Sequence, residues 1–251
     1  MASSAEVFLV GATTKKVLLS AAIGAPLLAL AYARWVRPWH LHWGVRDDEA
    51  IRSLPGDNLI PQPRMQATHA ITIEASPQLV WPWLVQMGQG RGGFYSYTWL
   101  ENLAGCQMRK SEELIPELQT LRVGDPIWLH PNASPMFVKA LEPERALVYF
   151  GGRDAFPEAK ESGMGIADPA FASSWAFVLE DAGPEGTRLI VRNRTTYSPG
   201  LQHEIACRCL LEPAHFVMER KLLRTLKWLV EGRKKGWLPE AEDDEPHPMF
   251  V

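Results

Sequence analysis

The sequence predicts an α+β fold in which one antiparallel sheet is covered by a single long helix. Three observations support this prediction. An alternating apolar pattern marks a strand at residues 69–75. Short alternating segments separated by turn residues then follow up to residue 195. A helical pattern with one apolar face runs from about Pro213 to Arg233. A sheet and a helix of this kind bury their apolar faces against one another, and the space between them is the natural place for a ligand.

Two short helical segments follow the opening strand. Ser76 and Pro77 supply an N-cap and a proline at the first helical position, so a helix is expected over residues 78–87. The next residues, 88–93, are rich in glycine. They follow a helix, whereas a dinucleotide-binding fingerprint follows a strand, so the loop is not expected to cradle phosphates. Residues 94–102 are expected to form a second short helix or a tight turn.

The remaining strands have the spacing of an antiparallel meander. One connection, Gly151–Ser173, is long and rich in glycine, proline and charge; connections of this length often act as lids. The strands are expected at Pro126–His130, Met136–Leu141, Ala146–Phe150, Ser174–Glu180 and Arg188–Thr195.

A hydrophobic segment precedes the predicted domain. Val17–Ala33 contains 17 residues without a charge, and a helix of this length spans roughly 26 Å at about 1.5 Å per residue. Because the hydrocarbon core of a bilayer is about 30 Å thick, we expect a membrane anchor. Two alternatives remain open. Ala31, Tyr32 and Ala33 match the small-x-small pattern of a cleaved signal peptide, and the helix could instead pack on the domain itself.

The distribution of charge and aromatic residues around this segment favours one orientation. Two lysines precede it and three arginines follow by residue 46, so the positive-inside rule favours a cytoplasmic folded domain anchored to the membrane. If the segment is instead a cleaved signal, the domain is exported. Trp35, Trp39 and Trp43 lie where an interfacial aromatic belt is expected.

The chain therefore divides into four expected parts. Residues 1–38 are the hydrophobic anchor segment, and residues 39–66 read as a linker rich in proline and charge. Residues 67–237 form the ligand-binding domain. Residues 238–251 form a tail in which Glu240–Glu245 carries five acids and no base, as is typical of disorder.

The composition excludes several classes of protein. Lys and Arg total 26 against 29 Asp and Glu, a net charge of −3, whereas nucleic-acid binding through phosphate neutralisation needs a basic excess. Three cysteines are too few for a disulfide scaffold. Ten tryptophans are a high number, which suits an apolar cavity or a membrane boundary. No cofactor motif was identified, so no cofactor is expected.

The long helix contains the most informative residue, Glu219. Placing residues 215–233 at 100° intervals puts Glu219 in the middle of the apolar arc, where a carboxylate must be paired or neutral. His215, one turn earlier, is a reachable partner. Glu219 could tie the helix to an arginine or backbone donor of the sheet. Alternatively, it could be a polar anchor or proton-transfer group inside an apolar pocket. The opposite, basic face of the helix carries Arg220, Arg224, Lys227 and Glu231.

A second group of candidate ligand-binding residues lies in one aromatic and polar segment. Tyrosine and tryptophan combine an apolar body with one hydrogen-bonding tip, as a hydrophobic ligand with one polar end requires. Ordinary packing beneath the short helices is the alternative. The candidates are Arg91, Tyr95, Tyr97 and Trp99, with Asn102 beside them.

The faces of two strands can also be assigned. In the last strand Leu189, Val191 and Asn193 share one face, which we place inward, and this makes Asn193 a further candidate. Arginines 188, 192 and 194 share the other face, although Arg192 or Arg194 could pair with Glu219 if it pointed inward. In the opening strand His69 shares a face with two isoleucines.

Metal binding and hydrolase chemistry are not expected. His203, Cys207 and Cys209 could supply three ligands, but their spacing fits no common zinc pattern and no fourth ligand is near in sequence. The chain contains no G-x-S-x-G motif and no recognisable nucleophile–histidine pairing.

Several of these stretches resemble the START and birch-pollen-allergen-like superfamily (SRPBCC), also called polyketide cyclase/dehydrase-like, in a bacterial branch. The resemblance covers residues 67–233, about two thirds of the chain. The segments that carry it are His69–Leu84, Arg91–Asn102, Leu121–Asp125, Leu141–Leu147, Ser174–Leu179 and Glu212–Lys221.

The resemblance implies a helix-grip fold, with lipids, sterols, polyketides or other hydrophobic molecules bound between sheet and helix. It implies no shared catalytic residues. Three functions are therefore considered: membrane-tethered binding or transfer of a hydrophobic small molecule or lipid, an enzyme of cyclase or dehydratase type acting on such a ligand, and an adaptor holding a partner protein at the membrane.

Overall fold

The computed structural model describes residues 24, 27, 30–46, 48–109, 111–152, 170–184 and 186–235, and it divides into two compact units. In the first unit, residues 1–41, a π-helical turn at Tyr32–Val36 leads into α2 at Arg37–Leu41. Most of Val17–Ala33 lies outside the described residues. Among those described, no helix is both long and apolar enough to span a bilayer.

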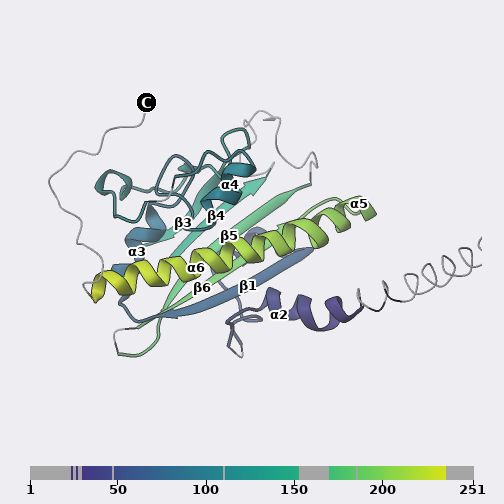
Figure 1. Cartoon of the computed structure of the whole chain (residues 1–251), viewed down its shortest axis with the longest axis horizontal. Helices are drawn as coiled ribbons and strands as arrows, with labels where there is room; N and C mark the ends of the chain where they lie inside the picture. The colour runs from purple at the N-terminus through teal and green to yellow at the C-terminus, as the bar shows by residue number, and fades with distance from the viewer. Residues whose placement is uncertain are drawn as a thin grey trace, which may run out of the picture. The chain divides into compact units, whose positions relative to one another are not determined.

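The second unit, residues 42–251, has the predicted α+β architecture. Its strands form one antiparallel six-stranded sheet in the order β1-β6-β5-β4-β3-β2 (Figure 1). The strands are β1 Met65–Ile73, β2 Pro126–Ile127, β3 Met136–Glu142, β4 Ala146–Gly152, β5 Ala172–Asp181 and β6 Thr187–Thr196. The prediction for Pro126–His130 was too long, because only the first two residues pair with β3.

The helices follow the predicted order. α3 spans Pro77–Val85, α4 spans Thr98–Leu103, and short 3-10 turns lie at Asp57–Leu59 and Pro116–Leu118. The long helix α6 spans Glu212–Lys234, as the apolar periodicity predicted. The helical path begins earlier than expected, with α5 at Leu201–Ile205 and a π-helical segment at Ala206–Leu211.

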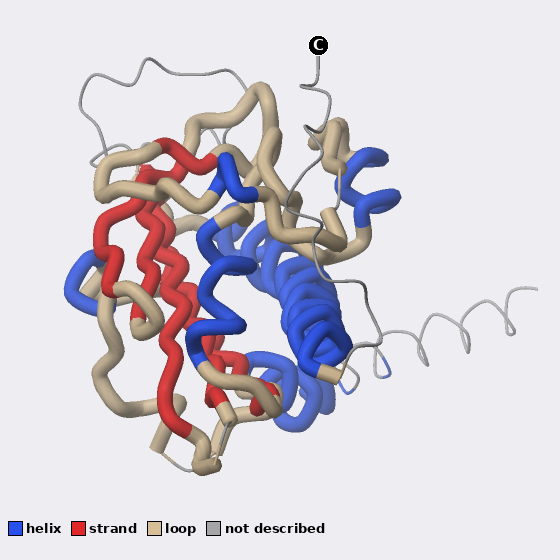
Figure 2. Tube along the Cα trace, turned by 90° about the vertical axis from the view of Figure 1, so that its left-hand side faces the viewer, coloured by secondary structure: helices blue, strands red, loops and turns tan. Residues whose placement is uncertain are grey.

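The main core lies between α6 and the inner face of the sheet. Figure 2 shows the strands as one layer with the long helix beside it. Leu223, Leu226 and Leu229 of α6 are fully buried with Leu189 and Val191 of β6. The predicted inward face of β6 is therefore correct. Alternation then places the arginines of this strand on the outer face.

The described residues between 42 and 60, within the segment predicted as a linker, run from the free edge of β1 across the outer face of the sheet; we call them the strap. Arg192 is buried and donates to the carbonyl oxygens of Glu49, Ala50 and Arg52 and to Asp57. Arg188 forms a two-pronged pair with Glu49 at 2.6 and 2.8 Å. Hydrogen bonds and ion pairs thus hold the strap on the outer face of the sheet, whereas apolar side chains hold α6 on the inner face.

The strap begins with a close backbone approach that requires glycine. Gly44 has a φ of +75°, and a Cβ there would lie 2.1 Å from the carbonyl oxygen of Ala70. The neighbouring Trp43 carbonyl accepts a hydrogen bond from the Ala70 N–H at 3.1 Å, and the Gly44 carbonyl accepts one from Arg188 at 2.6 Å. The start of the strap therefore covers part of the free edge of β1.

Candidate functional site

Glu219 of α6 lies at the centre of a buried polar cluster. Its side chain is 1% exposed and points at the sheet. One carboxylate oxygen, Oε1, accepts a hydrogen bond from Trp175 Nε1 at 2.7 Å. The other, Oε2, accepts one from His69 Nδ1 and lies 3.3 Å from His215 Nε2. Glu219 is thus paired, as its place in the apolar arc required.

The cluster joins three elements of the fold. His215 precedes Glu219 by one turn of α6, His69 lies on β1 and Trp175 lies on β5. Between β1 and β5 runs β6, where Val191 pairs with His69 and Asn193 pairs with Trp175. The carboxylate therefore reaches across β6 and fixes the first half of α6 to strands on either side.

The charges in the cluster support one another. Burial alone would raise the pKa of Glu219, but the positive charges and hydrogen bonds of His215 and His69 outweigh it and hold this pKa well below the ordinary value of 4.5. Burial alone would lower the pKa of His215, but the charge of Glu219 outweighs burial and raises it above 6.5. The cluster therefore favours an ionised carboxylate beside a protonated His215.

Aromatic rings surround this polar group. The Trp175 ring lies 6.2 Å from that of His215, 5.8 Å from Phe94 and 4.8 Å from Phe177, measured between centroids. Within the cluster His69 is fully buried, whereas the side chain of His215 is 22% exposed. Of the two histidines, His215 is therefore the one whose ring is partly exposed, although the nitrogen that faces Glu219 is buried.

The second half of α6 is more deeply buried than His215. Leu222, Leu223, Leu226, Leu229 and Val230 pack directly on the sheet and are between 0 and 2% exposed. A ligand between sheet and helix would therefore lie at the first half of α6, near His215 and Trp175, rather than along the whole helix.

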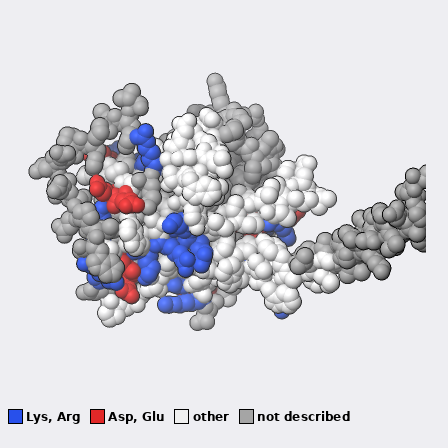
Figure 3. Space-filling model, viewed as in Figure 1, with Lys and Arg blue, Asp and Glu red and all other residues white. Residues whose placement is uncertain are grey.

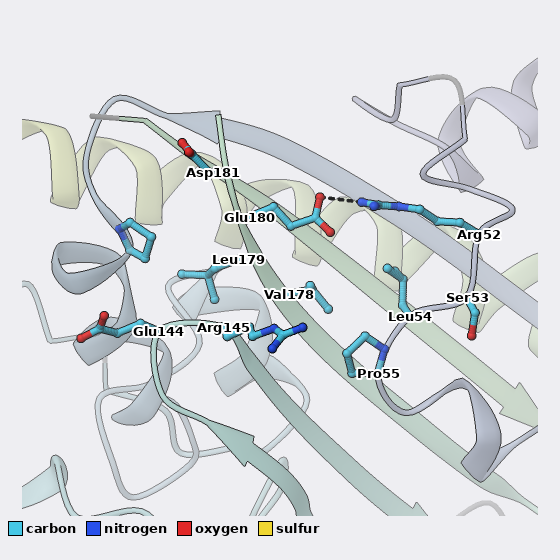
Figure 4. A pocket seen from close by; sticks show the side chains of 11 residues that line it. Arg52, Ser53, Leu54, Pro55, Glu144, Arg145, Val178, Leu179, Glu180 and Asp181 are labelled. Atoms are coloured by element: carbon cyan, nitrogen blue, oxygen red, sulfur yellow. Dashed lines mark hydrogen bonds and ion pairs between the residues drawn. The ribbon is translucent and has the colours of Figure 1, made fainter. Parts of the chain in front are cut away.

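A cavity of about 600 Å³ bordered by described residues lies elsewhere, between the strap and the end of β5 (Figure 4). Its charged groups already have partners: Arg52 pairs with Glu180 at 2.6 Å, and Arg145 lies 3.6 Å from Glu142. The charges around it are therefore already compensated within the fold. It is lined by Arg52, Ser53, Leu54, Pro55, Pro77, Glu144, Arg145, Val178, Leu179, Glu180 and Asp181.

The aromatic segment of residues 91–102 does not converge on Glu219. Tyr95 is fully buried and donates to the carbonyl oxygen of Trp83 at 3.0 Å. Arg91 donates to the carbonyl oxygens of Val85 and Leu118. These contacts hold α3 and the following loops together.

The other candidates occupy different environments. Tyr97 lies beneath the ammonium of Lys221 at 5.7 Å, and Trp99 is 67% exposed on α4. Asn102 bridges to both backbone groups of Met108. Asn193 is on the inner face beside Trp175, where it bonds to Ser173 and Thr195. Of the predicted site residues, the structure brings together Glu219 and His215. Asn193 lies close by on β6, paired with Trp175 of β5.

The sequence analysis missed His69 and Trp175 as partners of Glu219. It proposed an arginine or a backbone donor of the sheet, with Arg192 or Arg194 as candidates. Both arginines instead point outward and pair with Asp57 of the strap, at 2.6 and 3.3 Å. The available signal was a histidine that shares a face of the opening strand with two isoleucines, and strand order decided which donor reaches Glu219.

Comparison with known proteins leaves the family open. No protein-family model matches the chain, and no curated protein does. Solved structures that resemble it include a Mesorhizobium loti protein, 16% identical over 66% of this chain and 97% of that one, with a TM-score of 0.36. A protein from Arthrobacter aurescens is 13% identical over 80% and 95%, with a TM-score of 0.37. CalU16 from Micromonospora echinospora is 15% identical over 68% and 85%, with a TM-score of 0.31.

TM-scores below 0.5 do not establish a shared fold. The architecture therefore stands on this chain's own strand order and on the position of α6. These show a six-stranded antiparallel sheet with a long C-terminal helix on its inner face, an arrangement of the helix-grip type.

Proposed function

We propose that this chain binds a hydrophobic small molecule or lipid between the first half of α6 and the sheet. The observation that carries the proposal is the buried ionic cluster around Glu219. Replacing buried ion pairs by apolar side chains is often neutral or stabilising, so such a cluster is not needed merely to hold a helix on a sheet. Its position among aromatic rings, with the His215 ring partly exposed, supports recognition of a polar group on an otherwise apolar ligand.

We infer the chemistry of the ligand from the side chains around this position. Trp175, Phe94 and the neighbouring rings offer apolar surface. His215, whose pKa is raised by the charge of Glu219, favours a hydrogen-bond acceptor such as a carbonyl or carboxylate. The resemblance of residues 67–233 to the START-like superfamily supports the same class of ligand, and the hydrophobic segment at Val17–Ala33 supports a tether to the membrane that supplies it.

Binding can be tested with a dansyl-labelled undecanoic acid, whose fluorescence rises in an apolar site. We expect saturable binding by the full chain, weakened roughly 10- to 100-fold by His215→Gln, because a hydrogen bond from a charged donor is lost. Glu117→Gln, an exposed change on the short 3-10 turn, serves as the matched control. Absence of saturable binding, together with no apolar molecule recovered from purified protein by mass spectrometry, would contradict the proposal.

A second function, proton transfer on the bound ligand, is favoured by one specific observation. A partly exposed imidazole held by a buried carboxylate is the arrangement that a general acid or base requires. In a cyclase or dehydratase, His215 would exchange the proton and Glu219 would position the ring. Deuterium incorporation into a ligand recovered with the protein, measured in D₂O, should then depend on His215 and change its pH dependence in Glu219→Gln. If His215→Gln does not change deuterium incorporation, the proton-transfer function is contradicted and only ligand binding remains as the proposed function.

A further inference from the structure

The outward face of α6 carries a stripe whose composition differs from that of the rest of the helix. Val217, Arg220, Lys221, Arg224 and Trp228 are spaced i, i+3, i+4, i+7 and i+11, so they share one side of the helix. We call these five residues the basic stripe. The apolar side chains at its two ends are exposed, Val217 by 46% and Trp228 by 48%. Lys and Arg side chains gather over the middle of α6 (Figure 3).

The three cations of the stripe are not neutralised by acids. Arg220 and Arg224 lie 5.4 and 6.0 Å from the centroid of the Trp43 ring, and Lys221 lies above Tyr97. No carboxylate of the described residues pairs with any of the three. Glu219 faces the sheet, and Glu231, 13% exposed, pairs with Lys227. Stacking on aromatic rings holds the cations in place and leaves their charge available.

Exposed apolar side chains follow a segment that contacts α6 at this stripe. The segment leading into α4 contacts α6, because Ser96 Oγ donates to the carbonyl oxygen of Met218 at 3.0 Å and Tyr97 lies beneath Lys221. In the following helix, Trp99 is 67% and Leu103 78% exposed. Exposed tryptophan and leucine on a helix that directly follows this contact, together with a row of cations that no acid neutralises, suit the interface of an anionic membrane.

We infer that the folded unit itself docks on an anionic lipid bilayer through the basic stripe and the exposed Trp99 and Leu103. The cations would face the lipid phosphates while the apolar side chains enter the headgroup region. This inference is independent of ligand binding and of the N-terminal segment, because it rests on a different surface. It complements a membrane source for the ligand without requiring one.

The test measures binding of the full chain to sucrose-loaded vesicles. Phosphatidylcholine vesicles are compared with vesicles in which about a third of the lipid is phosphatidylglycerol, so the ratio of the two affinities reports the electrostatic contribution alone. Each cation near an anionic surface contributes on the order of a fivefold change in affinity. Arg220→Gln, Lys221→Gln and Arg224→Gln together should therefore lower the ratio by about a hundredfold, and high salt should do the same to the wild type.

Two controls separate docking from folding and from net charge. Arg122→Gln, Lys139→Gln and Arg145→Gln remove the same charge outside α6 and should leave the ratio within about threefold. Arg220→Lys with Arg224→Lys keeps the charge over Trp43 and should keep the ratio. The inference would be overturned if the wild type bound both kinds of vesicle equally well. It would also be overturned if the control substitutions lowered the affinity ratio as much as those in the basic stripe. The inference would likewise be overturned if the basic stripe captured an acidic soluble protein while the three Gln substitutions left vesicle binding unchanged.

Discussion

At the scale of single residues, Glu219 shows how one side chain can be recognised in a sequence before its partners are known. A carboxylate in the middle of an apolar helical arc must be compensated, and the arc is visible in the sequence because helical periodicity is local. Its i−4 neighbour His215 was predicted on the same local ground, and the 3.3 Å approach of the two side chains agrees with it. His69 lies 150 positions away and could not be assigned by such reasoning.

The opposed pKa shifts of Glu219 and His215 predict how stability depends on pH. Glu219 has a lowered pKa in the folded state, so its contribution is present above 4.5 and is lost as the pH falls. His215 has a raised pKa, so its contribution is present below 6.5 and is lost as the pH rises through the raised value. The free energy of unfolding should therefore be highest between these two values, as urea titrations across this range would show.

Glu219→Gln provides the variant that isolates this effect. Removing one partner of a buried ion pair costs about 3–5 kcal/mol, so we expect a loss of that order near the optimum and a flatter pH profile. The exposed change Glu117→Gln should leave both the optimum and its height unchanged. A profile of the same shape in wild type and Glu219→Gln would show that other groups set the pH dependence.

At the scale of elements, the strap shows why a segment's composition does not reveal its role. Residues 39–66 are rich in proline and charge, which locally indicates a linker. The structure places most of the strap on the outer face of the sheet, where it supplies acceptors to the arginines of β6. Arg188 and Arg192 are 6% and 2% exposed, and a buried guanidinium without partners would be costly. The strap, far away in the sequence, thus supplies the acceptors that the buried guanidinium groups of β6 require.

Arg192→Met should loosen the strap. The substitution removes the donors to three strap carbonyl oxygens and to Asp57, so we expect a loss of about 3–5 kcal/mol and faster trypsin cleavage after Arg52 under native conditions. Arg145→Met, whose side chain is 78% exposed, is the control and should change neither quantity by much. Unaltered cleavage in Arg192→Met would show that the strap is held without this guanidinium.

At the scale of the whole molecule, the proposed tether can be tested separately from the fold. If Val17–Ala33 anchors the chain, the full protein should stay with membranes during carbonate extraction. Leu19→Arg with Leu28→Arg should release it, because each charge in a bilayer costs about 3 kcal/mol on insertion scales. Ile51→Arg with Val123→Arg adds the same charge at exposed positions outside the segment. Release of the wild-type chain by carbonate would contradict the tether.

The sequence by itself determined the elements and their apolar faces. Strand alternation, the start of α3 at Ser76–Pro77 and the long apolar arc of α6 are patterns of period 2 and 3.6, and they are set by neighbours along the chain. The inward placement of Leu189 and Val191 and the anomaly of Glu219 follow from the same patterns. These were enough for the α+β class and for one pair of site residues.

Only the tertiary structure decided which distant side chains meet. The sheet order puts β6 between β1 and β5, and this brings His69 and Trp175 to the same carboxylate. It also turns the arginines of β6 towards the strap and leaves Arg91 and Tyr95 bound to backbone carbonyl oxygens near α3. The physical reason is that compensation of buried charge and burial of apolar surface depend on spatial neighbours, which no local period records.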